Sequence, residues 1–287
     1  MSEMTAAAYH SDTQRIGSTG LKLLHRSPSH YYAQYLDPNR ISKPPTPAML
    51  LGIYTHCAIL EPARFWDQYV CVDDAEICKS INAKNPRATV EYRRWYAEWS
   101  KSVNGKEVIA SDDYKTIIAM RDAVWSNSNA ATLLDGIVAE RSIYFTDKRT
   151  GALCKARPDG IRLGLVQRPV ILEIKTCENA SPEAFGRQAF NYRYHSQAAF
   201  YVDGYIAAGI SEELPIHITI AVEKEPPYAI ALYLTPDNVL EIGRHENAKD
   251  LEIYVNCLRS GSWHGYDTAI VPLQLPTWAL RQSQQYV

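Results

Sequence analysis

The 287-residue chain contains no apolar run long enough to cross a membrane. A membrane-spanning helix needs about 20 consecutive apolar residues, and here charged or polar residues interrupt every apolar stretch before that length. The first residues, Met1 to Met4, include an acidic side chain and begin no apolar signal segment. The sequence therefore excludes an integral membrane protein and predicts a cytoplasmic location with no membrane partner.

Closely spaced cysteine pairs are also missing. Disulfide frameworks belong mainly to small secreted domains, and structural zinc sites need pairs of ligands a few residues apart. Neither pattern occurs, so idle or buried thiols are the expected interpretation, because free cysteine is often buried. The six cysteines are Cys57, Cys71, Cys78, Cys154, Cys177 and Cys257.

The chain has no excess of basic charge. It carries 30 Lys and Arg against 32 Asp and Glu, which gives a net charge of −2. DNA binding would therefore require basic side chains gathered in one groove. Lys22 and Arg26 are candidates, although a solvated surface charge is the simpler explanation for each. No G-x-x-x-x-G-K-[ST] motif is present, so neither a bound nucleotide nor a fused helicase motor is expected.

The sequence pattern changes along the chain. Residues 1–15 are small and polar, which predicts a flexible tail. Residues 16–134 show helical spacing, whereas residues 135–260 mix strand and helix patterns. Residues 261–287 form a C-terminal extension. This order predicts one α/β domain over residues 16–287, with a helical N-terminal portion around a catalytic core.

The expected elements follow from periodicity and from capping residues. Helices begin at Ser18 and at Pro28, which stands at the first position of its helix. Further helices are expected at about 48–60, 89–104, 112–134, 181–208 and 236–259, and strands at 138–146, 153–157, 170–176, 216–222 and 228–234.

The most informative motif joins two carboxylates and a lysine. Pro158-Asp159 precedes a short loop, and Glu173-Ile174-Lys175 follows within an apolar strand. Side chains two apart in a strand share a face, so Glu173 and Lys175 point one way and Ile174 points into a core. Charged groups on such a strand need a partner or a metal. The set suits metal-assisted hydrolysis of a phosphodiester, although surface salt bridges would also explain it.

Two further candidates lie on predicted helices. Gln197 and Tyr201 are four residues apart and therefore share one helix face. His56 lies within an apolar helix, where a neutral imidazole can bind a metal. Taken singly, an ordinary amphipathic helix and a satisfied core histidine would explain these residues.

Together these residues resemble the PD-(D/E)xK nuclease superfamily in its RecB/RecE-like branch. The resemblance spans about residues 16 to 260 and implies a restriction-endonuclease-like fold, with a mixed β-sheet core flanked by helices. Its specificity lies in the order of the motifs and not in any one of them. The matching motifs are Ser27-Pro28-Ser29-His30-Tyr31, Gly52 to His56 with Leu60-Glu61-Pro62, Pro158-Asp159, Glu173-Ile174-Lys175 and Gln197-x-x-x-Tyr201, and the first two resemble motifs of exodeoxyribonuclease VIII-type enzymes.

The resemblance implies a metal centre. Asp159 and Glu173 would ligate Mg²⁺ or Mn²⁺ with help from the Ile174 carbonyl, and His56 would provide a further ligand. Relatives with an iron–sulfur cluster carry three cysteines near the C-terminus, whereas only Cys257 lies in that region here. No iron–sulfur cluster is therefore expected.

The remaining matched residues receive roles from the same resemblance. Lys175 would orient and help to deprotonate the attacking water, and a nearby cation would lower its pKa. Gln197 and Tyr201 would position the metal shell or the scissile strand. Arg157 could hold a phosphate, and a structural salt bridge is an equally good explanation for it.

By resemblance, the chain is a phage- or prophage-encoded exonuclease acting in a bacterial host cell. It would digest linear duplex DNA from free 5′ ends, as a ring-shaped homo-oligomer around the duplex, and would leave 3′ single strands for a RecT-like annealing protein. One alternative is a non-processive single-strand or structure-specific nuclease of the same superfamily. Another is a catalytically silent DNA-binding or inhibitor protein that keeps the fold.

Overall fold

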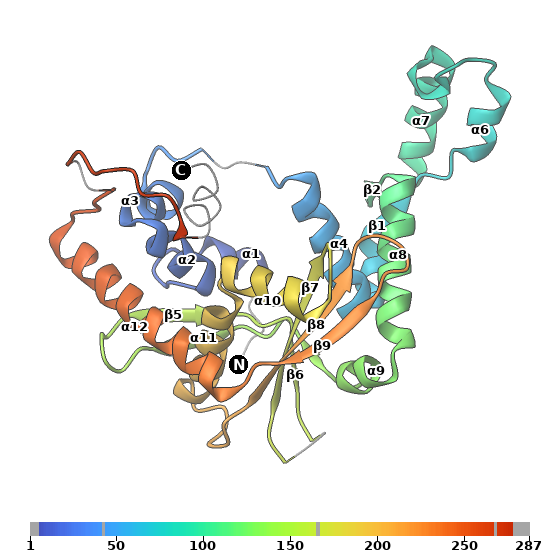
Figure 1. Ribbon diagram of the computed structural model, residues 1–287. Coiled ribbons are helices and arrows are strands. Elements are labelled where there is room, and N and C mark those ends of the chain that lie inside the picture. Colours follow the sequence, from blue (N-terminus) through green and yellow to red (C-terminus); the bar gives the residue numbers. More distant parts are fainter. Residues whose placement is uncertain (1–5, 42–43, 165–166, 267–268, 278–287) are drawn as a thin grey trace, which may run out of the picture.

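A five-stranded mixed sheet forms the centre of the computed structural model, which describes residues 6–41, 44–164, 167–266 and 269–277 (Figure 1). The strands lie in the order β3-β6-β7-β8-β9. Strands β6 and β7 form an antiparallel hairpin, β7 and β8 run parallel, and β9 returns antiparallel to β8. The bounds are β3 (Val138–Ala139), β6 (Gly160–Arg162), β7 (Val170–Cys177), β8 (Ile216–Glu223) and β9 (Ile230–Leu234).

Helices cover both faces of this sheet, as Figure 1 shows. The parallel pairing of β7 and β8 requires a crossover, and α10 and α11 provide it. The α-helices are α1 (Ala6–Ser11), α2 (Ser18–Arg26), α3 (Pro28–Tyr31), α4 (Pro47–Leu60), α5 (Pro62–Gln68), α6 (Ala75–Ser80), α7 (Val90–Ser102), α8 (Ser111–Ser126), α9 (Ser128–Leu134), α10 (Pro182–Asn191), α11 (Tyr194–Ala207) and α12 (Asp237–Ser260). None of these described helices is long and apolar enough to cross a membrane.

Side-chain alternation along β7 separates two cores. Ile174 is fully buried in a cluster with residues of α4, α8 and α9, among them Ile59 and Met120. Ile171 points to the opposite face and packs in a second cluster with α11 residues such as Ala198. Glu173 and Lys175 share the face of Ile171, so the predicted division between the two faces of this strand is confirmed.

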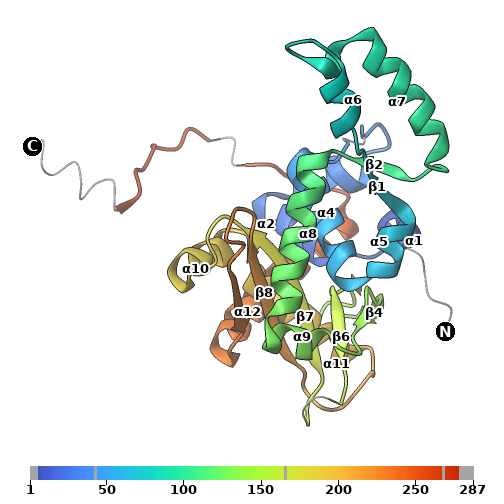
Figure 2. The same cartoon turned by 90° about the vertical axis from the view of Figure 1, so that its right-hand side faces the viewer.

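Two small sheets lie beside the central one. Strands β4 (Ile143–Thr146) and β5 (Leu153–Ala156) form an antiparallel hairpin that packs against α11. Strands β1 (Tyr69–Cys71) and β2 (Glu107–Ile109) pair in parallel within the portion expected to be helical. The segment between β1 and β2, with α6 and α7, extends away from the body in both views (Figures 1 and 2).

The mixed α/β fold is as predicted, but several boundaries differ. The helix expected over 112–134 is broken at Asn127, whose side chain caps α9 by accepting hydrogen bonds from Asn129 and Ala130. The strand expected over 138–146 is divided at Glu140, where φ is 53°. A left-handed residue cannot continue an extended strand, and this one separates β3 from β4.

Part of the segment predicted to be a flexible tail, residues 1–15, has regular structure. Residues 6–11 form α1, and Tyr9 is buried. The Lys155 ammonium donates hydrogen bonds to the backbone carbonyls of Tyr9 and Asp12, which ties the segment to β5. Residues 1–5, and residues 278–287 of the expected C-terminal extension, lie outside the described residues.

A glycine of α12 tests how tightly that helix packs against α11, and a glycine of α10 provides the comparison. A Cβ added at Gly243 of α12 would lie 2.8 Å from the backbone carbonyl carbon of His195, at the start of α11. Gly243→Ala should therefore lower the free energy of unfolding by about 1–3 kcal/mol through overpacking. At Gly186 of α10 nothing lies within 4 Å, so Gly186→Ala should raise stability by about 0.8–1.0 kcal/mol. Urea unfolding measures both, and equal effects would contradict this packing.

His217 on β8 gives a pH-dependent contribution to stability. Burial, with a smaller effect from Lys175, lowers the pKa of His217 to about 3. Above the unfolded pKa of about 6.5 both states are neutral, whereas below it only the unfolded chain takes up the proton. This contribution should therefore lower stability by about 1.4 kcal/mol per pH unit as the pH falls from about 6.5 towards 3. In His217→Gln the free energy of unfolding, measured by urea unfolding, should fall less steeply as the pH is lowered. The same pH dependence in both proteins would contradict this prediction.

Candidate active site

The β6–β7 hairpin brings two carboxylates together. Asp159 stands directly before β6, and the backbone N–H of Ile174 donates to its Oδ2 at 2.6 Å. Glu173 lies on β7, with its Oε2 3.5 Å from the backbone nitrogen of Asp159. The exposed fractions are 7% for Asp159 and 4% for Glu173, so both carboxylates are buried. The structure thus joins the two acidic residues that the sequence singled out.

Lys175 completes this cluster. Its Nζ donates to Glu173 Oε1 at 2.6 Å and lies 4.8 Å from the ring centroid of Tyr194. Tyr194 begins α11 and was not among the predicted site residues. Its position immediately before the Gln197 and Tyr201 helix face was the signal available in the sequence.

His56 reaches the cluster from the opposite layer. It lies on α4, and its Nδ1 is 3.6 Å from Asp159 Oδ1. Burial lowers the pKa of the His56 imidazole, and the charge of Lys175 lowers it further. The charges of Glu173 and Glu140, and a hydrogen bond with the Ile174 backbone, act against both effects. The imidazole is therefore favoured in its neutral form, the form that can bind a metal.

The carboxylates carry strongly raised pKa values. Burial raises the pKa of Asp159 to about 7. Burial also raises the pKa of Glu173 to about 7, and the charge of Asp159 adds to this effect. The charge of Lys175 lowers both pKa values without offsetting burial. Asp159 and Glu173 are two like charges removed from water, and Lys175 provides a single ammonium to compensate both. The site is therefore short of positive charge.

The carboxylates beside Lys175 determine the direction of its pKa shift. Burial on its own would lower the pKa of its ammonium, but the charges of Glu173 and Asp159 and the hydrogen bond to Glu173 raise it instead. The lowered pKa expected from the sequence required a cation beside the lysine. In this geometry Lys175 is the charged partner of Glu173.

Helix α11 contributes the predicted pair of polar residues. Gln197 Nε2 donates to the Tyr201 hydroxyl at 2.9 Å, so the two side chains meet on one face as expected. Tyr201 is buried, and burial together with the charge of Glu173 raises its pKa well above the usual value. Gln197 therefore holds a neutral phenol beside the carboxylates.

Two cavities meet at this cluster. One of about 360 Å³ is lined by Asp159, Tyr201 and Arg157 together with residues of the N-terminal segment. A smaller one of about 150 Å³ is lined by Lys175, Gln197 and Lys22, among others. Residues Ser18 and Thr19, at the start of α2, line both, so this helix terminus lies between the two cavities.

The predicted DNA-binding residues lie in different surroundings. Lys22 lines the smaller cavity with Lys175. Arg157 is bound to Glu140 at 2.7 Å and to the Ser142 hydroxyl at 2.8 Å, so it takes part in a salt bridge. Arg26 is exposed and donates to the Tyr266 hydroxyl. Lys22 is thus the one of the three that shares a cavity with Lys175.

The donor set fits a hard divalent cation. Carboxylate and carbonyl oxygens are the ligands that Mg²⁺ and Mn²⁺ prefer, and a neutral imidazole can also bind a metal. Asp159, Glu173 and the Ile174 carbonyl could hold the ion, with His56 beside them. Among the described residues, no three His, Cys, Asp or Glu side chains approach closely enough to form a ready-made metal site. One of the two Glu173 carboxylate oxygens, Oε1, accepts the hydrogen bond from Lys175.

Comparison with known proteins agrees with this geometry. Residues 17–268 match a family described as a PDDEXK-like domain of unknown function. The chain belongs to this family. The predicted PD-(D/E)xK assignment and fold are therefore confirmed, whereas the RecE-like branch stays a prediction.

A solved structure shares the fold of this PDDEXK-like chain. The chain is similar to the crystal structure of a "putative exonuclease" from Eubacterium rectale, with a TM-score of 0.61, 13% identity, and coverage of 98% of each chain. A second structure, SSO0001, has a TM-score of 0.30 and 17% identity over 71% of this chain and 86% of that one. This TM-score is too low to indicate a shared fold. No curated protein sequence matches the chain.

Metal binding should respond in opposite directions to two substitutions. At about pH 8, above the pKa of about 7 of both carboxyls, Glu173→Gln should abolish the calorimetric binding of Mn²⁺ because it removes a charged ligand. Lys175→Met should tighten binding about tenfold or more because it removes the competing ammonium. The exposed Lys148→Met provides a control without effect. Weaker binding in Lys175→Met would contradict this account of the site.

Proposed function

We propose that this PDDEXK-like chain is a divalent-metal-dependent deoxyribonuclease that hydrolyses linear duplex DNA from its ends, in the 5′ to 3′ direction. The observation that carries the proposal is the buried cluster of Asp159, Glu173 and Lys175 on the β6–β7 hairpin. Family membership and the fold support a nuclease. The name of the Eubacterium rectale protein favours an exonuclease among nucleases.

The cation would polarise the phosphate and lower the pKa of a water molecule at the site. Asp159 and Glu173 would hold it, with His56 and the Ile174 carbonyl as further ligands. Lys175 stabilises negative charge on the phosphate and orients the attacking water from the side of Glu173.

The residues of α11 and α2 position the scissile strand. Tyr201 is kept neutral by its surroundings and can donate its hydroxyl proton to a phosphate oxygen. Gln197 fixes the orientation of that hydroxyl. Lys22 adds positive charge at the mouth of the smaller cavity, where a DNA backbone would enter.

The finer parts of the proposal follow from the resemblance to RecE-type exonucleases. They are action in recombination, a phage or prophage source, a ring-shaped homo-oligomer and supply of 3′ single strands to a RecT-like annealing protein. A non-processive nuclease of the same superfamily would share the same site and differ in substrate choice. A silent relative is disfavoured because Asp159, Glu173 and Lys175 are all present and in contact.

The central assay is digestion of end-labelled linear duplex DNA with Mg²⁺, beside closed circular duplex of the same sequence. Linear DNA should be degraded with early release of the 5′ label, and closed circles should be spared. Asp159→Ala should remove activity because the cation loses a ligand, and Lys175→Ala should reduce it by about 100-fold to 1,000-fold. Glu212→Ala and Lys148→Ala change exposed residues of matching charge and should keep full activity.

The outcomes separate the candidates. Equal digestion of closed circles would identify an endonuclease, and early release of a 3′ label would reverse the polarity. Full activity in EDTA would contradict a metal-dependent mechanism. Inactivity of the unaltered chain on every DNA would favour the silent relative.

A further inference from the structure

An exposed run of aromatic side chains lies next to the catalytic lysine, at the junction of α10 and α11. The run begins with Phe190, near the end of α10, which has 69% of its surface exposed. Tyr192 follows, with 53% of its surface exposed. Tyr194 is half-buried and forms part of the wall of the smaller cavity. Scattered exposed aromatics need no explanation, but aromatics gathered at the edge of a charged cavity do.

Two of these rings form an ordered pair. The rings of Tyr192 and Tyr194 are stacked, with centroids 5.9 Å apart and an interplanar angle of 18°. Lys175 Nζ lies 4.8 Å from the Tyr194 centroid, and Lys22 Nζ lies 4.6 Å from the Tyr192 centroid. The pair therefore begins at the catalytic lysine and continues outward to a second ammonium.

The residue between the two rings is held in a strained conformation. Arg193 has φ of 58°, in the left-handed region that a residue with a side chain rarely adopts. Its guanidinium is 2.8 Å from Glu246 Oε2 and 2.8 Å from Asp250 Oδ2, both on α12. Such strain persists only where the surroundings fix it, so the junction is held in place by α12.

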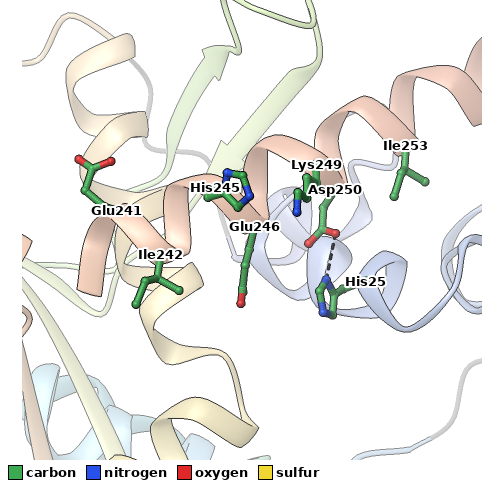
Figure 3. A pocket seen from close by; sticks show the side chains of 8 residues that line it. All are labelled: His25, Glu241, Ile242, His245, Glu246, Lys249, Asp250 and Ile253. Carbon is green, nitrogen blue, oxygen red and sulfur yellow. Dashed lines mark hydrogen bonds and ion pairs between the residues drawn. The ribbon is translucent and has the colours of Figure 1, made fainter. Parts of the chain in front are cut away.

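A third contact fixes the same anchor from α2. His25 Nδ1 is 3.0 Å from Asp250 Oδ1, the contact drawn as a dashed line in Figure 3. Figure 3 also shows Glu246 one turn before Asp250 on α12, at the wall of a cavity of about 750 Å³. This wide cavity contains none of the catalytic residues, and its polar wall serves to hold Arg193. The helix that carries Lys22 and the junction that carries the rings are thus joined through Asp250.

We propose that Tyr192 and Tyr194 form a stacking platform for a nucleobase next to the scissile phosphate, with Lys22 contacting the adjoining DNA backbone. This inference rests on the proposed nuclease function and names a residue pair that selects its substrate. Aromatic rings bind bases of any sequence by stacking, and lysines beside them neutralise phosphates. A purely structural role would bury Tyr192, whereas more than half of its surface is open.

The test uses a series of short single-stranded and duplex DNAs. Each carries one abasic site, and its distance from the DNA end differs from one substrate to the next. In the unaltered chain, one position should show a loss of about 5-fold to 150-fold in kcat/KM when the base is missing. Tyr192→Ala should lower kcat/KM on intact DNA by a similar factor and should lose the penalty for the missing base. Tyr192→Phe keeps the ring and should behave like the unaltered chain.

Trp66→Ala is the matched control, since Trp66 is also exposed, at 44%, and its ring contacts Phe65, Tyr114 and Arg121, none of which is a residue of the site. It should keep the position-dependent penalty. Unchanged melting temperatures would show that each variant is folded. If Tyr192→Ala keeps the same penalty as the unaltered chain, or no position shows one, the platform is wrong.

A binding measurement separates this inference from the proposed function. A 2-aminopurine base at the same position should lose fluorescence when the chain binds the DNA in Ca²⁺, and Tyr192→Ala should not quench it. Quenching without any hydrolysis in Mg²⁺ would keep the platform and overturn the nuclease. Hydrolysis with equal quenching by Tyr192→Ala would keep the nuclease and overturn the platform.

Discussion

The burial of two carboxylates beside a single lysine is the constraint on which the rest of the site depends. Burial of an uncompensated charge is costly, and here Asp159 and Glu173 share one ammonium, that of Lys175. Their raised pKa values are the electrostatic consequence. A divalent cation would supply the missing positive charge, and the binding of a cation would also free Lys175 from its role as the partner of Glu173. The same arrangement would therefore account both for metal binding and for the availability of the lysine for chemistry.

The central sheet makes this arrangement possible. The pairing of β6 with β7 sets Asp159 beside Glu173, and alternation along β7 places Ile174 in the opposite core. Because Ile174 is anchored there, its backbone N–H can reach Asp159 and its neighbours must face the cavity. Helix α4 brings His56 from one layer, and α11 brings Tyr201 from the other. The site thus lies where both helical layers reach the same edge of the sheet.

Much of this could be predicted from the sequence because the decisive signals are local. The two-residue spacing of Glu173 and Lys175 fixes their shared face in any strand, and the four-residue spacing of Gln197 and Tyr201 fixes theirs in any helix. What could not be predicted depends on contacts distant in sequence. The packing of Tyr9 near Lys155 and the anchoring of Arg193 by Asp250 join segments that no periodicity connects. The left-handed conformation of Glu140, which divides the expected strand, likewise leaves no mark in the pattern of apolar residues and could not be predicted.

The location of the cation is the central claim, and anomalous diffraction from crystals soaked in Mn²⁺ tests it most directly. The account predicts an anomalous peak within ligand distance of the carboxylate oxygens of Asp159 and Glu173, with Lys175 withdrawn from Glu173. Crystals of Glu173→Gln grown and soaked in the same way should show no peak there. A strong Mn²⁺ peak held by other residues, or an unchanged peak in Glu173→Gln, would contradict the account.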